Sequence, residues 1–542
     1  YPGFQSASSL YLSEMYLKQG RIAEALETID KSIELSGRST ISKFVKSYIL
    51  SGQGRKAEAM ELLEENIAFD RLDFLSRIEL ARLENDEAAL ADAIAHMGIP
   101  LQEVLEVSTY YGAVGAYAEA VDLLDYTMAN CPQYASTPMQ KNAVEPFTAS
   151  PLLNYMAGWY THLGGDADKA LEYYRKAAAM SPVYCFPSRN EEKLMLEDVT
   201  RLNPEDSKAW YYLGNLLYYY DQKDAAIAAW TESAEVSSDY GMVYRNLGFA
   251  ADKYLNDKAL AADYYRKAIE IDNTDPKFFT ELDILDEALR VPSKDRLARL
   301  VKNRTTIFKS DDATSRLVYL YVDNGDYDKA LDILNVRHFR VWEGGQTVYT
   351  QFVDAHLLKG LKLLARHQNK KALDEFLAAG TFPRNLETNE LSTGPTVAKV
   401  AYHQGLAYKA LGDEVKAAEA FNKCISTAGG GRRRVSMADE SKYYVAMSQK
   451  YLGDEAASRA TLAEVQKYLD EQFAESGTTV VDIYSKFGED GSNNVINARN
   501  LYVQGLVKLA QGDAAGARGF FAESLQLNPS NVWAKYYLNT KN

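Results

Sequence analysis

A short pattern of small and large residues recurs along this chain, and it constrains the fold more than any other feature. Residues 210–230 read WYYLGNLLYYYDQKDAAIAAW, in which Gly214 is followed by Ala226 and Trp230. The same frame returns at Gly405, Tyr408, Gly412, Ala417 and Phe421, at Gly505, Gly512, Ala517 and Phe521, and near the start at Ser13, Gly20, Ala25 and Ile29. Self-similarity at a fixed period predicts a chain built from repeated units.

Each position of the pattern has a mechanical reason in a pair of packed helices. A small residue such as Gly405 lets the two helices approach closely, and Ala417 does the same from the second helix. The large Phe421 fills the space between neighbouring pairs, and Gly412 ends the first helix, where a left-handed residue is commonly needed. Because one pair cannot bury its apolar stripe alone, the pairs must stack.

The spacing W-x2-L-G-x2-Y, followed by A-x3-F, resembles the tetratricopeptide repeat. The resemblance implies an all-α fold, a superhelix or α-solenoid of about 12 or 13 helical pairs, with a period of ~34 residues, several long inter-repeat loops and a concave surface. The expected divisions are N-terminal repeats over residues 1–132, central repeats over 151–425, and C-terminal repeats over 437–542 that include a capping helix at 531–538.

The net charge of the chain argues against one class of partner, nucleic acid. The chain has 60 basic and 75 acidic residues, a net charge of −15, so nucleic acid is not expected to bind its surface as a whole. One basic cluster, Arg432, Arg433 and Arg434 after three glycines, could cradle a phosphate or form a solvated loop. No apolar run approaches the roughly 18 residues that cross a bilayer, which predicts a protein without a membrane span.

Motifs for catalysis or for a cofactor are missing from the sequence. It contains no G-x-S-x-G, no phosphate-binding loop and no H-E-x-x-H. Its three cysteines, Cys131, Cys185 and Cys424, form no C-x-x-C pair, so neither a zinc site nor a redox pair is predicted. We therefore expect no catalytic residue, no metal and no cofactor in this chain.

Six stretches are longer than the usual connection between helices, namely 133–150, 183–206, 336–350, 380–396, 427–440 and 470–496. Three of them combine aromatic and charged residues, in VYCFPSRNEE, RHFRVWEGG and FPRNLETNE. Together with YYLGNLLY and YRNLG, these segments resemble the repeat portion of large bacterial proteins in which a galactose-mutarotase-like domain of unknown function precedes the repeats. Here WEGG is followed by Gln346 and Thr347, where that family usually has another Gly and a basic residue.

This second resemblance implies a carbohydrate setting and an N-terminal domain outside the chain, in which any catalysis would lie. It also implies a bacterial protein, soluble in the cytoplasm or in the periplasm. The first residues, YPGF, include no initiator Met and no signal peptide, as expected for a mature form or for part of a longer protein.

Candidate ligand positions follow from the repeat geometry. In such arrays the first helix of each pair lines the concave face, which predicts a groove for a ligand or partner that contains Tyr155, Trp159, Tyr211, Asn215, Tyr218 and Arg245. Aromatic faces beside amide and guanidinium donors suit a peptide or a sugar ring. The alternative is that these side chains only pack between repeats and insertion loops.

The segment HFRVWEGGQTVY, residues 338–349, interrupts the helical pattern. Its glycines allow a turn with positive φ, and Phe339 and Trp342 could pin the loop onto neighbouring helices. Alternatively, Arg340, Trp342 and Glu343 form a tip that faces a missing domain or its ligand. These three residues, together with Arg189 of the CFPSR segment, are therefore predicted to dock loops onto the body or onto a neighbouring domain.

Two functions from different classes fit these observations. The first is a non-enzymatic scaffold that mediates protein–protein or interdomain interaction, with a protein or peptide as its partner. The second is an accessory repeat region of a carbohydrate-active protein, mutarotase-like or glycoside-processing, with carbohydrate as a further ligand. The full-length gene product distinguishes them, because a β-sandwich with clustered acidic or His residues ahead of the repeats favours the second.

Overall fold

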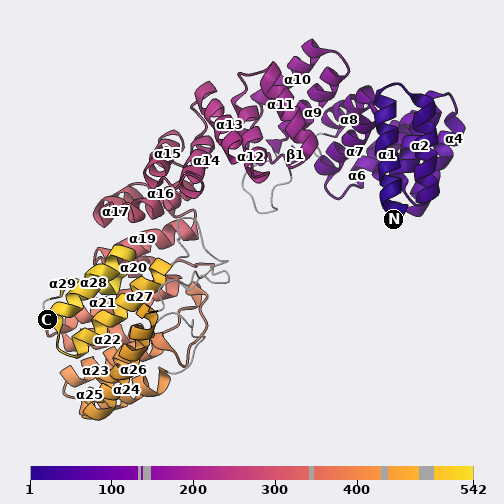
Figure 1. Ribbon diagram of the computed structural model, residues 1–542. Coiled ribbons are helices and arrows are strands. Elements are labelled where there is room, and N and C mark those ends of the chain that lie inside the picture. The colour runs from indigo at the N-terminus through magenta and orange to yellow at the C-terminus, as the bar shows by residue number, and fades with distance from the viewer. Residues whose placement is uncertain are drawn as a thin grey trace. The chain divides into compact units, whose positions relative to one another are not determined.

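The computed structural model describes residues 2–131, 136–137, 148–340, 347–428, 438–474 and 493–540. Over these residues the regular structure is helical, as predicted, except for β1 (Ser136–Thr137) and β2 (Thr148–Ala149), which pair antiparallel with Ser136 opposite Ala149. The chain forms two compact units, Tyr1–Asp239 and Tyr240–Asn542 (Figure 1). The predicted all-α repeat fold is confirmed, whereas the division into three stretches of repeats stays a prediction.

The first unit holds thirteen helices within its described residues. They are α1 (Pro2–Lys18), α2 (Ile22–Leu35), α3 (Thr40–Gly52), α4 (Lys56–Phe69), α5 (Phe74–Glu84), α6 (Glu87–Ala95), α7 (Pro100–Val114), α8 (Tyr117–Asn130), α9 (Pro151–Leu163), α10 (Ala167–Ala179), α11 (Asn190–Leu202), α12 (Ser207–Tyr219) and α13 (Lys223–Val236).

The second unit holds sixteen helices within its described residues, and η1 (Arg384–Leu386) is a short 3-10 turn among them. The helices are α14 (Gly241–Lys253), α15 (Lys258–Ile271), α16 (Pro276–Ala288), α17 (Ser293–Lys302), α18 (Arg304–Ile307), α19 (Asp311–Asp323), α20 (Tyr327–Leu334), α21 (Thr347–Leu364), α22 (Asn369–Ala378), α23 (Pro395–Ala410), α24 (Glu414–Thr427), α25 (Ser441–Tyr451), α26 (Glu455–Ala474), α27 (Asn493–Ala510), α28 (Ala514–Leu527) and α29 (Val532–Asn539).

Consecutive helices pair with one another, and the pairs stack. Across the described residues there are thirteen such pairs, from α1 with α2 to α27 with α28, while α11, α18 and α29 stand outside the pairing. This agrees with the repeat count that the sequence predicts. In the second unit, successive first helices from α19 through α21, α23 and α25 to α27 contact one another and form one continuous surface, which we call the inner surface.

A glycine on the first helix of a pair lies directly under an aromatic ring of the second helix. A Cβ atom at Gly405 would stand 2.5 Å from Cε1 of Phe421, and one at Gly214 would stand 2.4 Å from Cδ1 of Trp230. The N-terminal pairs use serine instead: Ser13 is fully buried, and its hydroxyl donates to the Ala25 carbonyl at 2.8 Å. The small residues of the recurring pattern therefore set the distance between paired helices.

One predicted loop contains a helix. Residues 183–206 were expected to form a long connection, but α11 occupies thirteen of them. Its sequence, NEEKLMLEDVTRL, buries Met195, Leu196 and Val199, whose spacing places them on one face of a helix. Glu192 accepts from the backbone N–H of Arg189 at 2.8 Å and so caps the first turn. The sequence does not predict this helix because the segment lacks the glycine–aromatic pattern of the paired helices.

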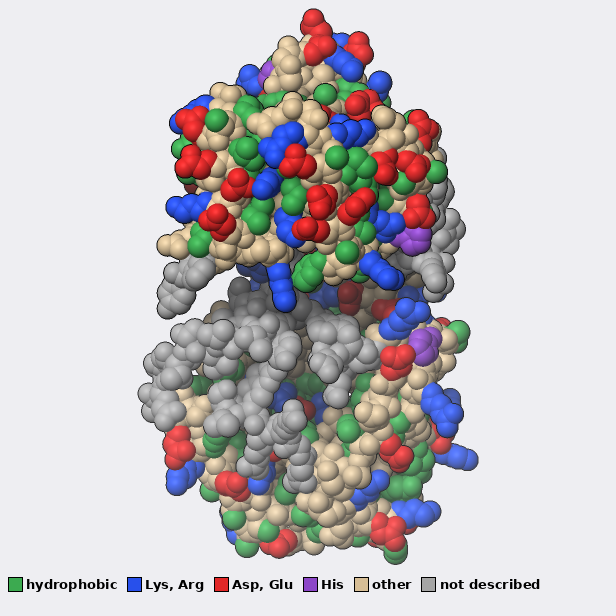
Figure 2. Space-filling model, turned by 90° about the vertical axis from the view of Figure 1, so that its right-hand side faces the viewer, with side chains coloured by type: hydrophobic (Ala, Val, Ile, Leu, Met, Phe, Trp, Pro, Cys, Tyr) green, Lys and Arg blue, Asp and Glu red, His purple; other side chains and the backbone are tan. Residues whose placement is uncertain are grey.

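Charged residues of both signs lie on the surface of the first unit (Figure 2). On the face of the first unit that Figure 2 shows, acidic and basic side chains are interspersed. Among the helices that the structure describes, none combines the length and the apolar character that crossing a membrane requires.

The close contact at Gly405 generates a stability prediction. We expect Gly405→Ala to lower the free energy of unfolding by about 1–3 kcal/mol, because the added methyl group meets the Phe421 ring at a distance that forces the helices apart. Gly519→Ala is the matched control, since a Cβ atom there has no neighbour within 4 Å, and better helix propensity should stabilise α28 by about 0.5–1 kcal/mol. Thermal denaturation followed by circular dichroism measures both, and equal effects at the two sites would contradict this account.

Candidate partner-binding surfaces

Tyr155, which the sequence places in a groove, lies inside the first unit. Its ring is fully buried, and its hydroxyl donates to Oδ2 of Asp206 at 2.8 Å. Asp206 also caps α12, because its carboxylate accepts from the backbone N–H groups of Lys208 and Ala209, each at 3.1 Å. Burial raises the pKa of Asp206, although these donors oppose the shift. Tyr155 therefore links α9 to the start of α12.

The other predicted positions of the first unit differ in exposure. Tyr211 is 8 % exposed, whereas Trp159, Asn215 and Tyr218 are partly exposed. Asn215 accepts from the indole N–H of Trp230 at 3.1 Å, and the Tyr218 ring lies 5.4 Å from the Trp230 ring. These side chains thus pack within their own repeat and also reach the surface, and their role in binding stays a prediction.

Helix α11 packs against the first helices α9 and α12. Its Asp198 carboxylate receives the Tyr174 hydroxyl at 2.7 Å and lies 2.8 Å from Nδ1 of His162, while Arg201 pairs with it from the same helix. The loop before α11 is also held, since both terminal nitrogens of Arg189 donate to Gln102, to its side-chain oxygen at 3.0 Å and to its carbonyl at 3.1 Å. An inserted segment therefore lies beside the predicted positions.

Arg245, the last predicted groove residue, belongs to the second unit. Its guanidinium forms a two-pronged ion pair with Glu281 of α16, at 2.7 and 2.9 Å. Its planar face also lies 5.1 Å from the Phe249 ring. This geometry ties α14 to α16, and a bidentate pair of this kind is a strong, directional contact.

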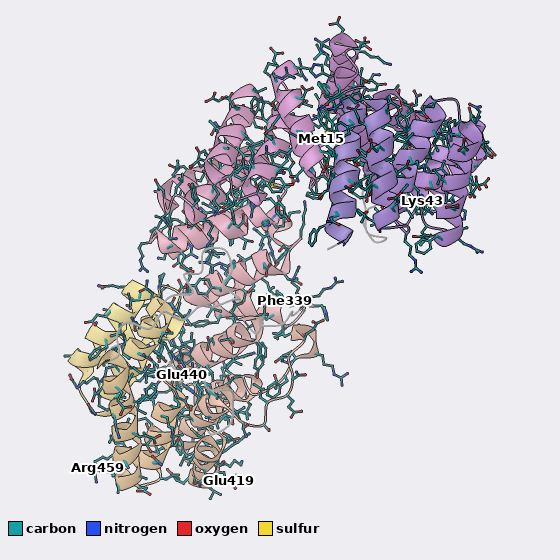
Figure 3. All side chains as sticks on the ribbon, turned by 45° about the vertical axis from the view of Figure 1, so that its right-hand side comes forward. Met15, Lys43, Phe339, Glu419, Glu440 and Arg459 are labelled. Carbon is teal, nitrogen blue, oxygen red and sulfur yellow. The ribbon has the colours of Figure 1, made fainter. Side chains whose placement is uncertain are left out.

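Two of the insertion segments dock onto each other in the second unit. The Phe339 side chain is fully buried, and its N–H donates to the Asn385 carbonyl at 2.8 Å (Figure 3). The Asn385 amide in turn donates to the carbonyls of Leu334 and Arg337 at 2.7 and 2.8 Å. The N–H of Arg340 donates to Oδ2 of Asp311 at 3.0 Å. Residues 337–340 are the part of the RHFRVWEGG segment that the structure describes.

Some of the residues that the sequence singles out cannot be placed in this structure. Trp342 and Glu343 of the same segment, and the cluster formed by Arg432, Arg433 and Arg434, lie outside the described residues. Within the described residues, no group of three or more His, Cys, Asp or Glu side chains is arranged to hold a metal ion.

The inner surface of the second unit is occupied by the chain's own C-terminal helix, α29. Figure 1 shows this helix, in yellow, next to α28. The indole N–H of Trp533 donates to Oδ1 of Asp354 on α21 at 2.7 Å, across 179 residues of sequence. The Lys399 ammonium of α23 lies 3.6 Å from the centre of the Trp533 ring, and the His403 ring lies 5.7 Å from it. Only 4 % of the Trp533 surface remains exposed.

Asp354 and Lys399, which contact the Trp533 ring, belong to a cluster of charged side chains. Lys399 lies 3.8 Å from Asp354 and 3.6 Å from Glu440, and Arg499 of α27 lies 3.1 Å from Glu440. Burial raises the pKa of Asp354. For Glu440, burial acts in the same direction, but Arg499 and Lys399 outweigh it and hold the pKa below its ordinary value. Figure 3 shows Glu440 among the helices of this unit, whereas Glu419 and Arg459 lie on the outer helices.

Residues far away in the sequence hold the last two helices. Lys535 forms an ion pair with Asp323 at the end of α19. Arg290, which follows α16, donates to the carbonyls of Leu525 and Gln526 at the end of α28. A basic side chain at the last carbonyls of a helix satisfies acceptors that would otherwise lack a partner. The segment from α28 to α29 therefore closes back onto α16, α19, α21 and α23.

The burial of Tyr211 generates a prediction that separates packing from binding. We expect Tyr211→Ala to lower the free energy of unfolding by about 3 kcal/mol, because an almost fully buried ring is lost from the core. Tyr219→Ala, at a neighbouring side chain that is 77 % exposed, should change it by less than about 0.5 kcal/mol. Thermal denaturation without any ligand tests this, and unchanged stability of Tyr211→Ala would favour a role in binding instead.

A pH dependence follows from His403. Burial lowers the pKa of His403 to about 3, so the folded chain does not bind the proton that the unfolded chain binds below about pH 6.5. Stability should therefore fall with decreasing pH by up to about 1.4 kcal/mol per pH unit from this residue. Phe at position 403 cannot titrate, so the stability deficit of His403→Phe at pH 7 should shrink towards pH 5. Parallel pH profiles of the two proteins would contradict the assignment.

Comparison with known proteins identifies repeats within the array. The tetratricopeptide repeat family matches residues 243–275 and 398–429, which correspond to the pairs α14 with α15 and α23 with α24. Among solved structures, the chain is similar to yeast Tom70, with 12 % identity over 99 % of this chain and 99 % of that one and a TM-score of 0.25.

Two further solved structures give similar values. The APC/C hetero-tetramer Cut9–Hcn1 shares 13 % identity over 97 % of this chain and 94 % of that one, with a TM-score of 0.25. A human IFIT1 dimer with PPP-AAAA shares 14 % identity over 90 % of each chain, with a TM-score of 0.22. The two segments that match the family model are tetratricopeptide repeats within a longer array of helical pairs.

Proposed function

We propose that this chain is a non-enzymatic helical-repeat scaffold that binds a protein or peptide on the surface formed by the first helices of its pairs. The observation that carries the proposal is the exposure pattern of α9 and α12. Trp159 and Asn215 each follow the glycine that contacts the second helix, so they occupy equivalent positions on the two helices, and both reach the surface. Tyr218, one turn further along α12, is also partly exposed.

These side chains have the chemistry of a binding surface. An indole and a phenol ring offer large contact areas at a low cost in conformational entropy, and an amide adds directional hydrogen bonds. Tetratricopeptide repeats that stack in this way present such residues in register, and a peptide that runs across α9 and α12 would meet them in turn. The buried Tyr155 and Tyr211 support this surface from beneath rather than facing a partner.

The predicted link to a carbohydrate-active protein rests on the sequence resemblance alone. It concerns a galactose-mutarotase-like domain ahead of the repeats, with that domain or carbohydrate as a partner, and it stays a prediction. In that arrangement the scaffold would hold the neighbouring domain, with Arg189 and Arg340 near the docked insertion segments as the expected contacts.

Site-specific photo-crosslinking in the native cell tests the proposed function. A benzophenone amino acid at position 159 or 218 should give discrete crosslinked species, because a bound partner lies within reach of the first helices. Positions 172 and 232, occupied by exposed glutamates on the second helices α10 and α13, are matched controls and should give none. Equal yields at all four positions, or crosslinks from the second helices alone, would contradict the proposal.

A further inference from the structure

Helix α29 makes contacts of a kind that proteins use at exchangeable interfaces. It is anchored by the hydrogen bond from Trp533 to Asp354, by the ion pair from Lys535 to Asp323 and by the cation–π contact with Lys399. Buried tryptophan anchors with charged neighbours are typical of interface hot spots. If α29 left, water could reach Asp354 and Lys399, so the charges that it covers would be hydrated rather than stranded.

Helix α29 also depends on this surface for its own structure. It has eight residues, and an isolated helix of that length is not stable in water. Its N-cap, Asn531, accepts from the N–H of Ala534 at 3.0 Å, but the remaining stabilisation comes from α28 and from the inner surface. Docking of α29 is therefore coupled to its folding, and its release from the inner surface would unfold it.

We propose that the inner surface of the second unit is a recognition site for a helical peptide, that α29 occupies this site in the same chain, and that a partner helix of the same chemistry displaces α29. The inference deepens the proposed function, on which it rests, by naming the chemistry of a partner. Such a partner carries a tryptophan whose N–H reaches Asp354 and whose ring covers Lys399. It also carries a basic residue two positions later that reaches Asp323.

Each anchor specifies one property of the partner. Asp354 accepts a hydrogen bond, which an indole provides and a phenylalanine ring does not. Lys399 lies over the ring face, where an aromatic quadrupole attracts an ammonium group. Asp323 is 1 % exposed at its side chain and requires a cation, so an acidic residue in the position of Lys535 would be repelled.

The experiment uses the full chain and a synthetic fluorescein-labelled peptide with the sequence of residues 528–542. Trp533→Ala removes the main anchor of α29 and leaves the receiving side chains in place. By fluorescence anisotropy, Trp533→Ala should bind the peptide, and the wild-type chain should bind it at least about tenfold more weakly, because tethered α29 competes at an effective concentration on the order of mM. Hydrogen exchange of residues 532–539 verifies the release of α29, and Lys535→Asp is added if they remain protected.

A charge exchange identifies the site of binding. In the Trp533→Ala chain, a peptide with the substitution Lys535→Asp should bind about tenfold more weakly than the parent peptide, because two carboxylates then face each other at Asp323. With Asp323→Lys added to that chain, the preference for the two peptides should reverse. Asp354→Leu, which removes the acceptor for the indole N–H, should weaken binding of the parent peptide in either chain.

Three results would overturn the inference. The first is a chain with released α29 that does not bind the peptide, which makes α29 a structural cap only. The second is that wild type and Trp533→Ala bind the peptide equally and that Asp323→Lys has no effect on this binding. The peptide would then bind at a site other than the inner surface. The third is a dimer, detected by light scattering, in which a second copy supplies α29. None of these results affects the photo-crosslinking expected at positions 159 and 218. The proposed function is therefore tested independently of this inference.

Discussion

An aromatic ring seated on a glycine is the contact on which the rest of this array depends. Among the described residues it joins the first and second helix of six helical pairs, between Gly158 and Tyr174, Gly214 and Trp230, Gly248 and Tyr265, Gly360 and Phe376, Gly405 and Phe421, and Gly505 and Phe521. In each, a methyl group on the glycine would approach a ring carbon to within 2.8 Å, so no larger residue fits without a shift. This contact fixes the spacing of two helices, and the pair so formed is the unit that stacks.

The local nature of this contact explains how much of the fold the sequence predicts. Gly405 and Phe421 lie sixteen residues apart, so a short window contains the whole signal and the register of each pair follows directly. Glycines such as Gly412, with a φ of 79°, add a second local signal at the end of the first helix. Helix α11 was missed because it has no partner helix and therefore none of these small residues. The only sequence feature that indicates this helix is the spacing of its apolar residues. The rest of the segment is typical of a loop.

The candidate site was harder to predict, because exposure depends on contacts between distant residues. Repeat position alone places Tyr155 and Trp159 on the same surface, yet Tyr155 is buried under the cap of α12 and Trp159 is not. The sequence around Asp206 reveals a helix start, but not that a tyrosine 51 residues earlier would donate to it. In the same way, residues 531–538 indicate a capping helix, and α29 forms there. Its position against α21, however, depends on how the five helical pairs from α19 to α28 stack, which the local sequence does not reveal.

Carboxylates fix both the inserted helix and the terminal helix on first helices of the array. Helix α11 supplies its own Asp198, which lies 2.8 Å from Nδ1 of His162 on α9. For α29 the array supplies the carboxylates, Asp354 on α21 and Asp323 on α19. Apolar contacts hold both helices as well, because Met195, Leu196 and Val199 of α11 and Ala534 of α29 are fully buried. The carboxylates add direction to these apolar contacts. Polar anchors give direction and register at modest net stability. The carboxylates on α19 and α21 therefore set the position of α29 more than they add to its stability.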